Sequence, residues 1–212
     1  MLKKCALGIL IATASLSAQA SELDYSYIQA DFSTLDISTN DNTAVLGIDF
    51  DDKLTGYDVA GSIGFAEHFY GFAGYADVDG DTDAFGYKVD TTYTEFYVGA
   101  GYHHSVSENT DWIIEASYVD DEFKASLQGS SESVSDSGFR IASGIRGQFT
   151  EKSEATVKFN YTDVNDFGSG FGLDIEAVYH FTDHFGITAG WEYGDRDDVD
   201  LMYFNIGARY SF

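Results

Sequence analysis

The sequence predicts an all-β fold: a transmembrane, antiparallel, up-and-down β-barrel of about ten strands, with eight strands as the alternative. Two observations predict it. In residues 202–212, Met202, Phe204 and Ile206 begin a series in which apolar residues alternate with polar or small ones, and most candidate strands alternate in the same way. Side chains in a strand point to opposite faces with period two, so each segment has an apolar and a polar face. Every lysine or arginine within a candidate strand falls on the polar face. A membrane barrel requires this arrangement, with lipid outside and a polar lumen inside.

Ten strands are expected from this alternation, each defined by the residues that would face outwards. In chain order, those residues are Ile28, Ala30 and Phe32; Tyr57, Val59, Gly61, Ile63 and Phe65; Tyr70, Phe72, Gly74 and Ala76; Phe96, Val98, Ala100 and Tyr102; Trp112, Ile114, Ala116 and Tyr118; Phe139, Ile141, Ser143, Ile145, Gly147 and Phe149; Ala155, Val157, Phe159 and Tyr161; Phe171, Leu173, Ile175, Ala177, Tyr179 and Phe181; Phe185, Ile187, Ala189, Trp191 and Tyr193; and Met202 to Phe212. Most of these faces carry aromatic residues at both ends, as expected at the two interfaces of a membrane.

The connections between the expected strands alternate in length. Short links fall near 66–68, 106–111, 150–154 and 182–184, and longer ones near 36–54, 78–91, 119–137, 162–170 and 194–199. Short periplasmic turns and longer extracellular loops are typical of membrane barrels, so both chain ends are expected to be periplasmic.

The charged residues on the polar faces are predicted to form a charge network in the lumen. A lysine or arginine on the lipid face costs about 2–4 kcal/mol at mid-membrane, which favours the inward position. Opposite charges that share one interior can pair, and pairing offsets their desolvation. The predicted network is Asp58, Glu95, Glu115, Arg140, Arg146, Lys158, Asp174, Glu176, Glu192 and Arg209. The remaining mature-chain cations are expected in loops or turns: Lys53, Lys88, Lys124, Lys152 and Arg196.

Residues 1–20 are predicted to be a signal peptide, and residues 21–212 a single barrel domain. Lys3 and Lys4 precede a short apolar stretch, and an A-x-A pattern ends at Ala20. The apolar stretch is much shorter than the roughly 20 residues of a spanning helix. Cys5 is the single cysteine of the chain, so the predicted mature protein uses no disulfide.

The composition argues against nucleic acid as a partner. The formal net charge is −25, whereas nucleic-acid binding needs clustered cations. The content of 17 Phe and 15 Tyr also disfavours a disordered acidic chain.

The C-terminal residues Ala208-Arg209-Tyr210-Ser211-Phe212 resemble the assembly signal of bacterial outer-membrane barrels. The glycine-rich segments 96–102 and 205–210 are similar to strands of small outer-membrane barrels such as the OmpA and OprF barrel domains. The resemblance implies the outer membrane of a Gram-negative bacterium, contact with lipid and lipopolysaccharide, and recognition of Phe212 by the barrel-assembly machinery. Ten strands exceed the eight of the OmpA type, and the peptidoglycan-binding domain of some relatives of that type is not expected here.

No catalytic, cofactor or metal site is predicted. The five histidines lie in or near the short turns, at His68, His103, His104, His180 and His184. No Ser–His–Asp arrangement is evident on the opposite side.

The acidic segment 77–83 resembles a calcium loop but has Thr82 and Lys88 where an EF-hand needs Gly and Glu. Its carboxylates, with those near Asp51, Asp120 and Asp195, are interpreted as a solvated acidic crown. Weak binding of divalent cations there is a further hypothesis.

The function predicted from the sequence is that of a non-enzymatic outer-membrane barrel with a structural or surface-interaction role and acidic extracellular loops. The alternative is a narrow, cation-preferring pore or transporter for small solutes. Eight-stranded barrels have room only for side chains, and wide channels need about 16–18 strands, so ten strands lie near the closed limit.

Overall fold

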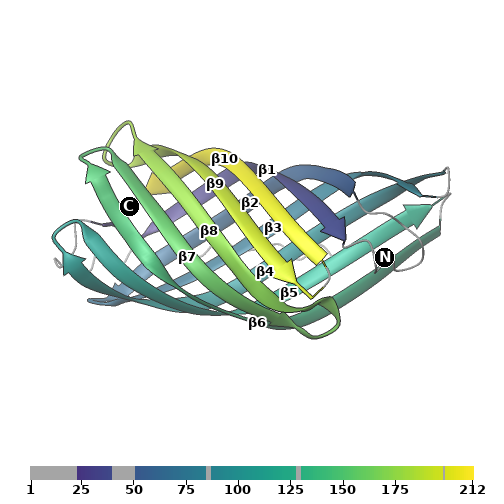
Figure 1. The fold of residues 1–212 in the computed structure, drawn as a ribbon. Helices are drawn as coiled ribbons and strands as arrows, with labels where there is room; N and C mark the ends of the chain where they lie inside the picture. The colour runs from purple at the N-terminus through teal and green to yellow at the C-terminus, as the bar shows by residue number, and fades with distance from the viewer. Residues whose placement is uncertain (1–22, 40–50, 85–86, 128–129, 198) are drawn as a thin grey trace.

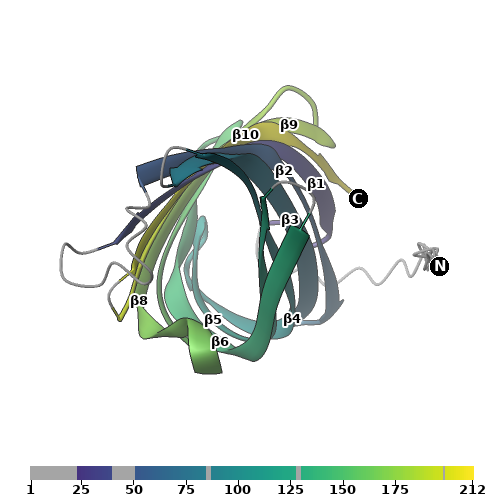
Figure 2. The ribbon, with the colours of Figure 1, turned by 90° about the vertical axis from the view of Figure 1, so that its right-hand side faces the viewer.

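The computed structural model describes residues 23–39, 51–84, 87–127, 130–197 and 199–212, and in these ranges ten antiparallel strands close into a barrel (Figures 1 and 2). Each strand pairs with its neighbours in sequence, and β1 pairs with β10 to close the ring. The strands are β1 (Tyr27–Thr39), β2 (Asp51–Ala66), β3 (Phe69–Ala84), β4 (Tyr87–Ser107), β5 (Thr110–Leu127), β6 (Ser130–Thr150), β7 (Ser153–Val164), β8 (Gly168–His180), β9 (Phe185–Arg196) and β10 (Val199–Ser211). A short 3-10 turn, η2 (Asn165–Phe167), links β7 to β8. The predicted up-and-down barrel of ten strands is confirmed.

Among the described residues, no helix combines the length and the apolar character needed to cross a membrane.

The outer wall of the barrel carries the large apolar side chains, as predicted for nine of the ten strands. Ile28, Phe32, Ile141, Phe159 and Ile206 are all exposed there. Since strand side chains alternate, the residues between them point into the barrel. The outer surface is therefore a continuous apolar band, and the polar side chains gather inside.

The predicted phase of β3 is wrong. Tyr70 was expected outside with Phe72, Gly74 and Ala76, but it is buried inside the barrel, whereas Phe69 and Tyr75 are exposed. The alternation could not decide the phase, because aromatic rings occupy both faces of this strand.

Cross-strand partners explain the phase of β3. Tyr70 lies opposite Gly101, and Gly74 lies opposite Tyr97, in the β3–β4 register. A β-carbon at either glycine would collide with the facing tyrosine ring. Each inward ring therefore occupies space that a neighbouring glycine leaves open.

Strands β3 to β6 extend beyond the barrel at the end opposite the short turns. The β6 strand has 21 residues whereas its neighbour β7 has 12. Figure 1 shows the β3–β4 and β5–β6 hairpins projecting to the right past the ends of β8 to β10. The long loops expected near 78–91 and 119–137 are thus wrong: the described residues of these ranges continue the paired strands. We call this projecting part of β3 to β6 the overhang, and its side of the barrel the overhang end.

One edge of the overhang has no strand beside it in the described structure. Residues 130–137 of β6 pair with β5, but pairing with β7 begins only at Gly138 opposite Val164. Asn165 of η2 contacts Asp136 and the Ser137 carbonyl, so the edge strand with backbone groups open on one side is residues 130–135. We call residues 130–135 the free edge.

The outward phase gives a direct stability prediction. Ile206→Arg should lower the free energy of unfolding by about 2–4 kcal/mol, because Ile206 is 62% exposed on the apolar wall and would place a cation in lipid. Urea unfolding of the refolded protein in lipid, followed by fluorescence of Trp112 and Trp191, measures it.

Ser131→Arg is the matched control for this substitution, because Ser131 is exposed on the overhang rather than on the barrel wall. Its stability should stay within about 0.5 kcal/mol of the native value. Equal losses for the two variants would contradict the assignment of the outer wall to lipid.

Candidate functional site

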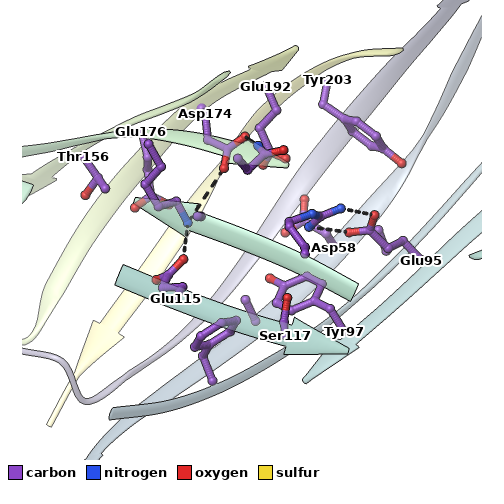
Figure 3. A pocket seen from close by; sticks show the side chains of 18 of the residues that line it. Asp58, Glu95, Tyr97, Glu115, Ser117, Thr156, Asp174, Glu176, Glu192 and Tyr203 are labelled. Atoms are coloured by element: carbon purple, nitrogen blue, oxygen red, sulfur yellow. Dashed lines mark hydrogen bonds and ion pairs between the residues drawn. The ribbon is translucent and has the colours of Figure 1, made fainter. Parts of the chain in front are cut away.

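The interior of the barrel holds the ten residues predicted from the sequence as a charge network. They line one cavity with a volume of about 220 Å³. Figure 3 shows Asp58, Glu95, Glu115, Asp174 and Glu192 arranged around this space. Each reaches it because its strand places alternate side chains inside. The network divides into three groups along the barrel.

The group towards the overhang end is built on two arginines. Arg140 donates to Glu95 through two parallel hydrogen bonds, of 3.2 Å to Oε1 and 2.6 Å to Oε2. Arg196 donates to Asp121 Oδ2 at 2.6 Å and lies 3.6 Å from Glu95 Oε2. Such paired, charge-assisted contacts are among the stronger hydrogen bonds in proteins.

The middle group centres on Lys158. Its Nζ donates to Glu115 Oε2 at 3.0 Å and lies 4.0 Å from Asp174 Oδ2. Tyr70 donates to the other oxygen of Glu115 at 2.7 Å, and Asn160 donates to Asp174 at 2.8 Å. The group therefore depends on the inward phase of β3, since Tyr70 and Lys158 each donate to one of the two oxygens of Glu115.

The group towards the short turns joins Arg146 and Arg209 through Glu154. Arg146 donates to Glu154 Oε2 at 2.8 Å, and Arg209 donates to Oε1 at 3.3 Å. Arg209 also donates to Glu176 at 2.5 Å and, through Nε at 2.8 Å, to Gln29. His180 Nε2 lies 3.2 Å from Glu154 Oε1.

Two carboxylates on β1 and β2 are held by neutral donors. Asp31 lies directly opposite Asp58 in the register. Asp31 accepts hydrogen bonds from Gln29 and Thr188, and Asp58 accepts one from Ser33. Across the described interior, carboxylates outnumber cations, so the chamber has an acidic balance.

Sequence reasoning missed several members of this interior. Arg196 was expected in a loop but is the last residue of β9 and is buried. Asp121 was assigned to an acidic loop, and Glu154 to a turn, yet both pair with interior arginines. Their inward parity was a usable signal, but the expected strands stopped short of these positions.

Near the short turns, His103 forms a small polar cluster with Asp111 and Tyr25. Tyr25 donates to Asp111 Oδ2 at 2.9 Å, and His103 Nδ1 lies 3.1 Å from the same oxygen. The rings of Tyr25 and His103 stack with centroids 4.2 Å apart. The three side chains therefore hold one another in place within the barrel mouth.

The described residues contain no group of three or more His, Cys, Asp or Glu side chains placed to hold a metal ion. The acidic segment 77–83, whose likeness to a calcium loop was noted, lies in β3 as paired strand. Asp49 and Asp198 of the proposed acidic crown lie outside the described residues.

Most of the chain matches a known family of membrane proteins. A family model described as the outer membrane protein beta-barrel domain matches residues 6–169. No curated protein matches the chain.

Among solved structures, Ail, the attachment invasion locus protein of Yersinia pestis, is 18% identical with a TM-score of 0.48, covering 88% of this chain and 97% of that one. Neisserial surface protein A is 15% identical with a TM-score of 0.46, covering 88% and 96%. The NanC porin is 12% identical with a TM-score of 0.48, covering 86% and 100%.

Removing one interior cation should destabilise the barrel strongly. Arg209→Met should lower the free energy of unfolding by about 3–5 kcal/mol, because it leaves Glu176 and Glu154 short of a buried partner. Adding Glu176→Gln should recover part of that loss, since the two sites are coupled.

Lys88→Met is the control, because the pair that Lys88 forms with Asp81 is exposed and such pairs contribute about 0–1 kcal/mol. Urea unfolding of all four proteins measures the differences. A loss for Arg209→Met no larger than that for Lys88→Met would contradict a stabilising interior network.

Proposed function

This chain belongs to the outer membrane protein β-barrel domain family, and we propose that it is a non-enzymatic barrel with a surface-interaction role carried by the free edge. The protein resides in the outer membrane of a Gram-negative bacterium. We place the overhang outside the cell and both chain ends in the periplasm, in line with the short turns at the opposite end.

The direction of the backbone groups on the free edge follows from one hydrogen bond. Asn165, on the β7 side of β6, donates to the backbone carbonyl of Ser137 at 2.7 Å. In an antiparallel strand the N–H and C=O of one residue point to the same edge, and the direction alternates along the chain. Ser131, Ser133 and Ser135 therefore direct both backbone groups away from β5.

The free edge lacks three of the features that usually block strand pairing: proline, lysine and a bulge. Natural edges carry proline, lysine or a bulge. The sequence SSESVS of residues 130–135 contains neither proline nor lysine, and its register with β5 is continuous. Serine side chains are short and leave the backbone accessible, so this edge suits the addition of an extended segment as a further strand.

Charge on the free edge favours a basic partner. Glu132 lies within the edge, and the protein as a whole carries a net charge of −25. A second copy aligned antiparallel on the same edge would bring like charges together, which is unfavourable. We therefore propose an extended, basic segment of another protein as the occupant.

The remaining partners are proposed on simpler grounds. Lipid and lipopolysaccharide would contact the apolar wall, and the exposed ring of Phe212 would engage the barrel-assembly machinery. Outward carboxylates such as Asp77 and Asp120, which accept hydrogen bonds from Tyr75 and Tyr118, would bind divalent cations weakly.

Two further proposals concern the removal of a signal peptide and the absence of an enzymatic activity. The signal peptide 1–20 lies outside the described residues and remains a proposal, with 21–212 as the mature domain. The non-enzymatic role is supported by interior charges that are engaged with one another.

Two substitutions of Ser133 distinguish a partner that pairs with the backbone of the free edge from one that recognises its side chains. Ser133→Pro removes an edge-facing N–H without removing a bond to β5, and proline is tolerated on such edges. We expect adhesion of cells carrying this variant to immobilised basic proteins to fall to the level of cells without the barrel. Ser133→Ala keeps the N–H and should adhere like the native protein.

Circular dichroism and heat-dependent mobility in SDS gels confirm that both variants remain folded. If the proline variant adheres as well as the native protein, strand addition at the free edge is wrong. If the alanine variant loses adhesion equally, the serine hydroxyl rather than the backbone is responsible.

A further inference from the structure

At the overhang end, the side chains that point into the barrel are apolar rather than polar. Leu35, Leu54 and Val78 point inwards there, and their exposed fractions are 0%, 1% and 0%. They form one cluster with buried Ile37 and Tyr93. The partly buried residues packed against this cluster are Phe123, Val199, Leu201 and Tyr203. We call this set the apolar seal; it draws side chains from β1 to β5 and from β10, which are consecutive around the ring.

The opposite mouth is occupied by the segment that precedes β1. Leu23 and Tyr25 are buried against Tyr70 and Ile113. Tyr25 stacks on Tyr70 with ring centroids 4.7 Å apart, and the Arg146 guanidinium lies 4.8 Å from the Tyr25 centroid. The chain is held at this point by a hydrogen bond from the Phe212 N–H to the Ser26 carbonyl. We call residues 23–25 the N-terminal plug.

The charged cavity lies between these two apolar regions. Its lining reaches Tyr25, Tyr70 and Ile113 at one end and Leu201 and Tyr203 at the other. The lumen of a membrane barrel is ordinarily polar, and contact with lipid explains only the apolar residues that point outwards. The inward apolar residues therefore need another explanation, and we look for it in the access of water and ions to the lumen.

We propose that the charged lumen is a closed chamber, isolated from the medium by the apolar seal and from the periplasm by the N-terminal plug. Apolar constrictions stop ions by excluding water, whereas charged side chains alone leave a hydrated route between them. Because the chamber is acidic in balance, loosening both closures creates a path that favours cations. The closures act in series, so each must be opened for ions to pass. This inference does not depend on the role proposed for the free edge.

Cysteine accessibility tests the seal without requiring conduction. Ala60 points inwards on β2 and lines the cavity, so Ala60→Cys in a Cys5→Ser background reports entry into the chamber. The probe is 2-aminoethyl methanethiosulfonate, a small cationic thiol reagent, added to intact cells. Ser131→Cys on the exposed free edge gives the rate of an open site.

The seal is loosened by Leu54→Asn and Val78→Thr, which keep side-chain size but add polarity. We expect the thiol introduced by Ala60→Cys to be protected when the seal is native. Its modification should accelerate about tenfold with the seal variants, equivalent to about 1.4 kcal/mol in the free energy of opening. Val59→Thr, the same kind of change on the outer face of β2, should leave the rate unchanged.

Val78→Thr alone serves as the second variant if the double change impairs folding, which gel mobility reports. Rapid modification of the Ala60→Cys thiol with the seal intact would overturn the proposal. Continued protection in a folded seal variant would overturn it as well, because the closure would then lie elsewhere.

Conductance across a planar bilayer tests the arrangement in series. The native protein, the seal variant and Tyr25→Ala should each be silent, and the combined variant should show cation-preferring steps. Steps from the native protein, or silence of the combined variant with both mouths accessible to the probe, would refute the closed chamber.

Discussion

The closed ladder of ten strands is the constraint on which the rest of this structure depends. In lipid every backbone donor and acceptor must be paired within the chain, and a closed ring of strands achieves this without an edge. It leaves each side chain two directions, outwards to lipid or inwards to the lumen. Arg140, Arg146, Lys158 and Arg209 then have one acceptable direction, and the carboxylates that pair with them must share it. The interior network thus follows from closure of the barrel as well as from the charged residues in the sequence.

Closure also explains how the interior is filled. Ten strands enclose more space than eight, and long charged side chains with inward rings occupy it. The rings of Tyr70 and Tyr97 fit because Gly101 and Gly74 lie opposite them. Tyr70 in turn donates to Glu115, so packing and charge pairing are satisfied by the same side chain. This double use means that a change in one strand's phase would disrupt both.

The sequence alone was sufficient for the fold and for most of the barrel's phase, because a strand such as β9 carries large apolar residues on one face only. It was insufficient for β3, where Phe69, Tyr70, Phe72 and Tyr75 put rings on both faces and the decision lies with glycines of the next strand. It was also insufficient for the overhang, since SSESVSDS is polar on both faces and gives no alternation. Arg196 and Asp121 are 75 residues apart, and their contact depends on the closure of the whole ring.

In the overhang, closure of the barrel no longer pairs every strand edge. A closed ring abolishes edges only as far as neighbouring strands have equal height, and β6 continues past the point where its pairing with β7 stops. Unpaired backbone in lipid would be prohibitive, whereas outside the lipid water can pair with it. The apolar seal lies at the base of this taller wall and uses side chains from β1 to β5 and from β10. The same inward apolar cluster therefore packs against three of the strands that continue into the overhang, β3, β4 and β5.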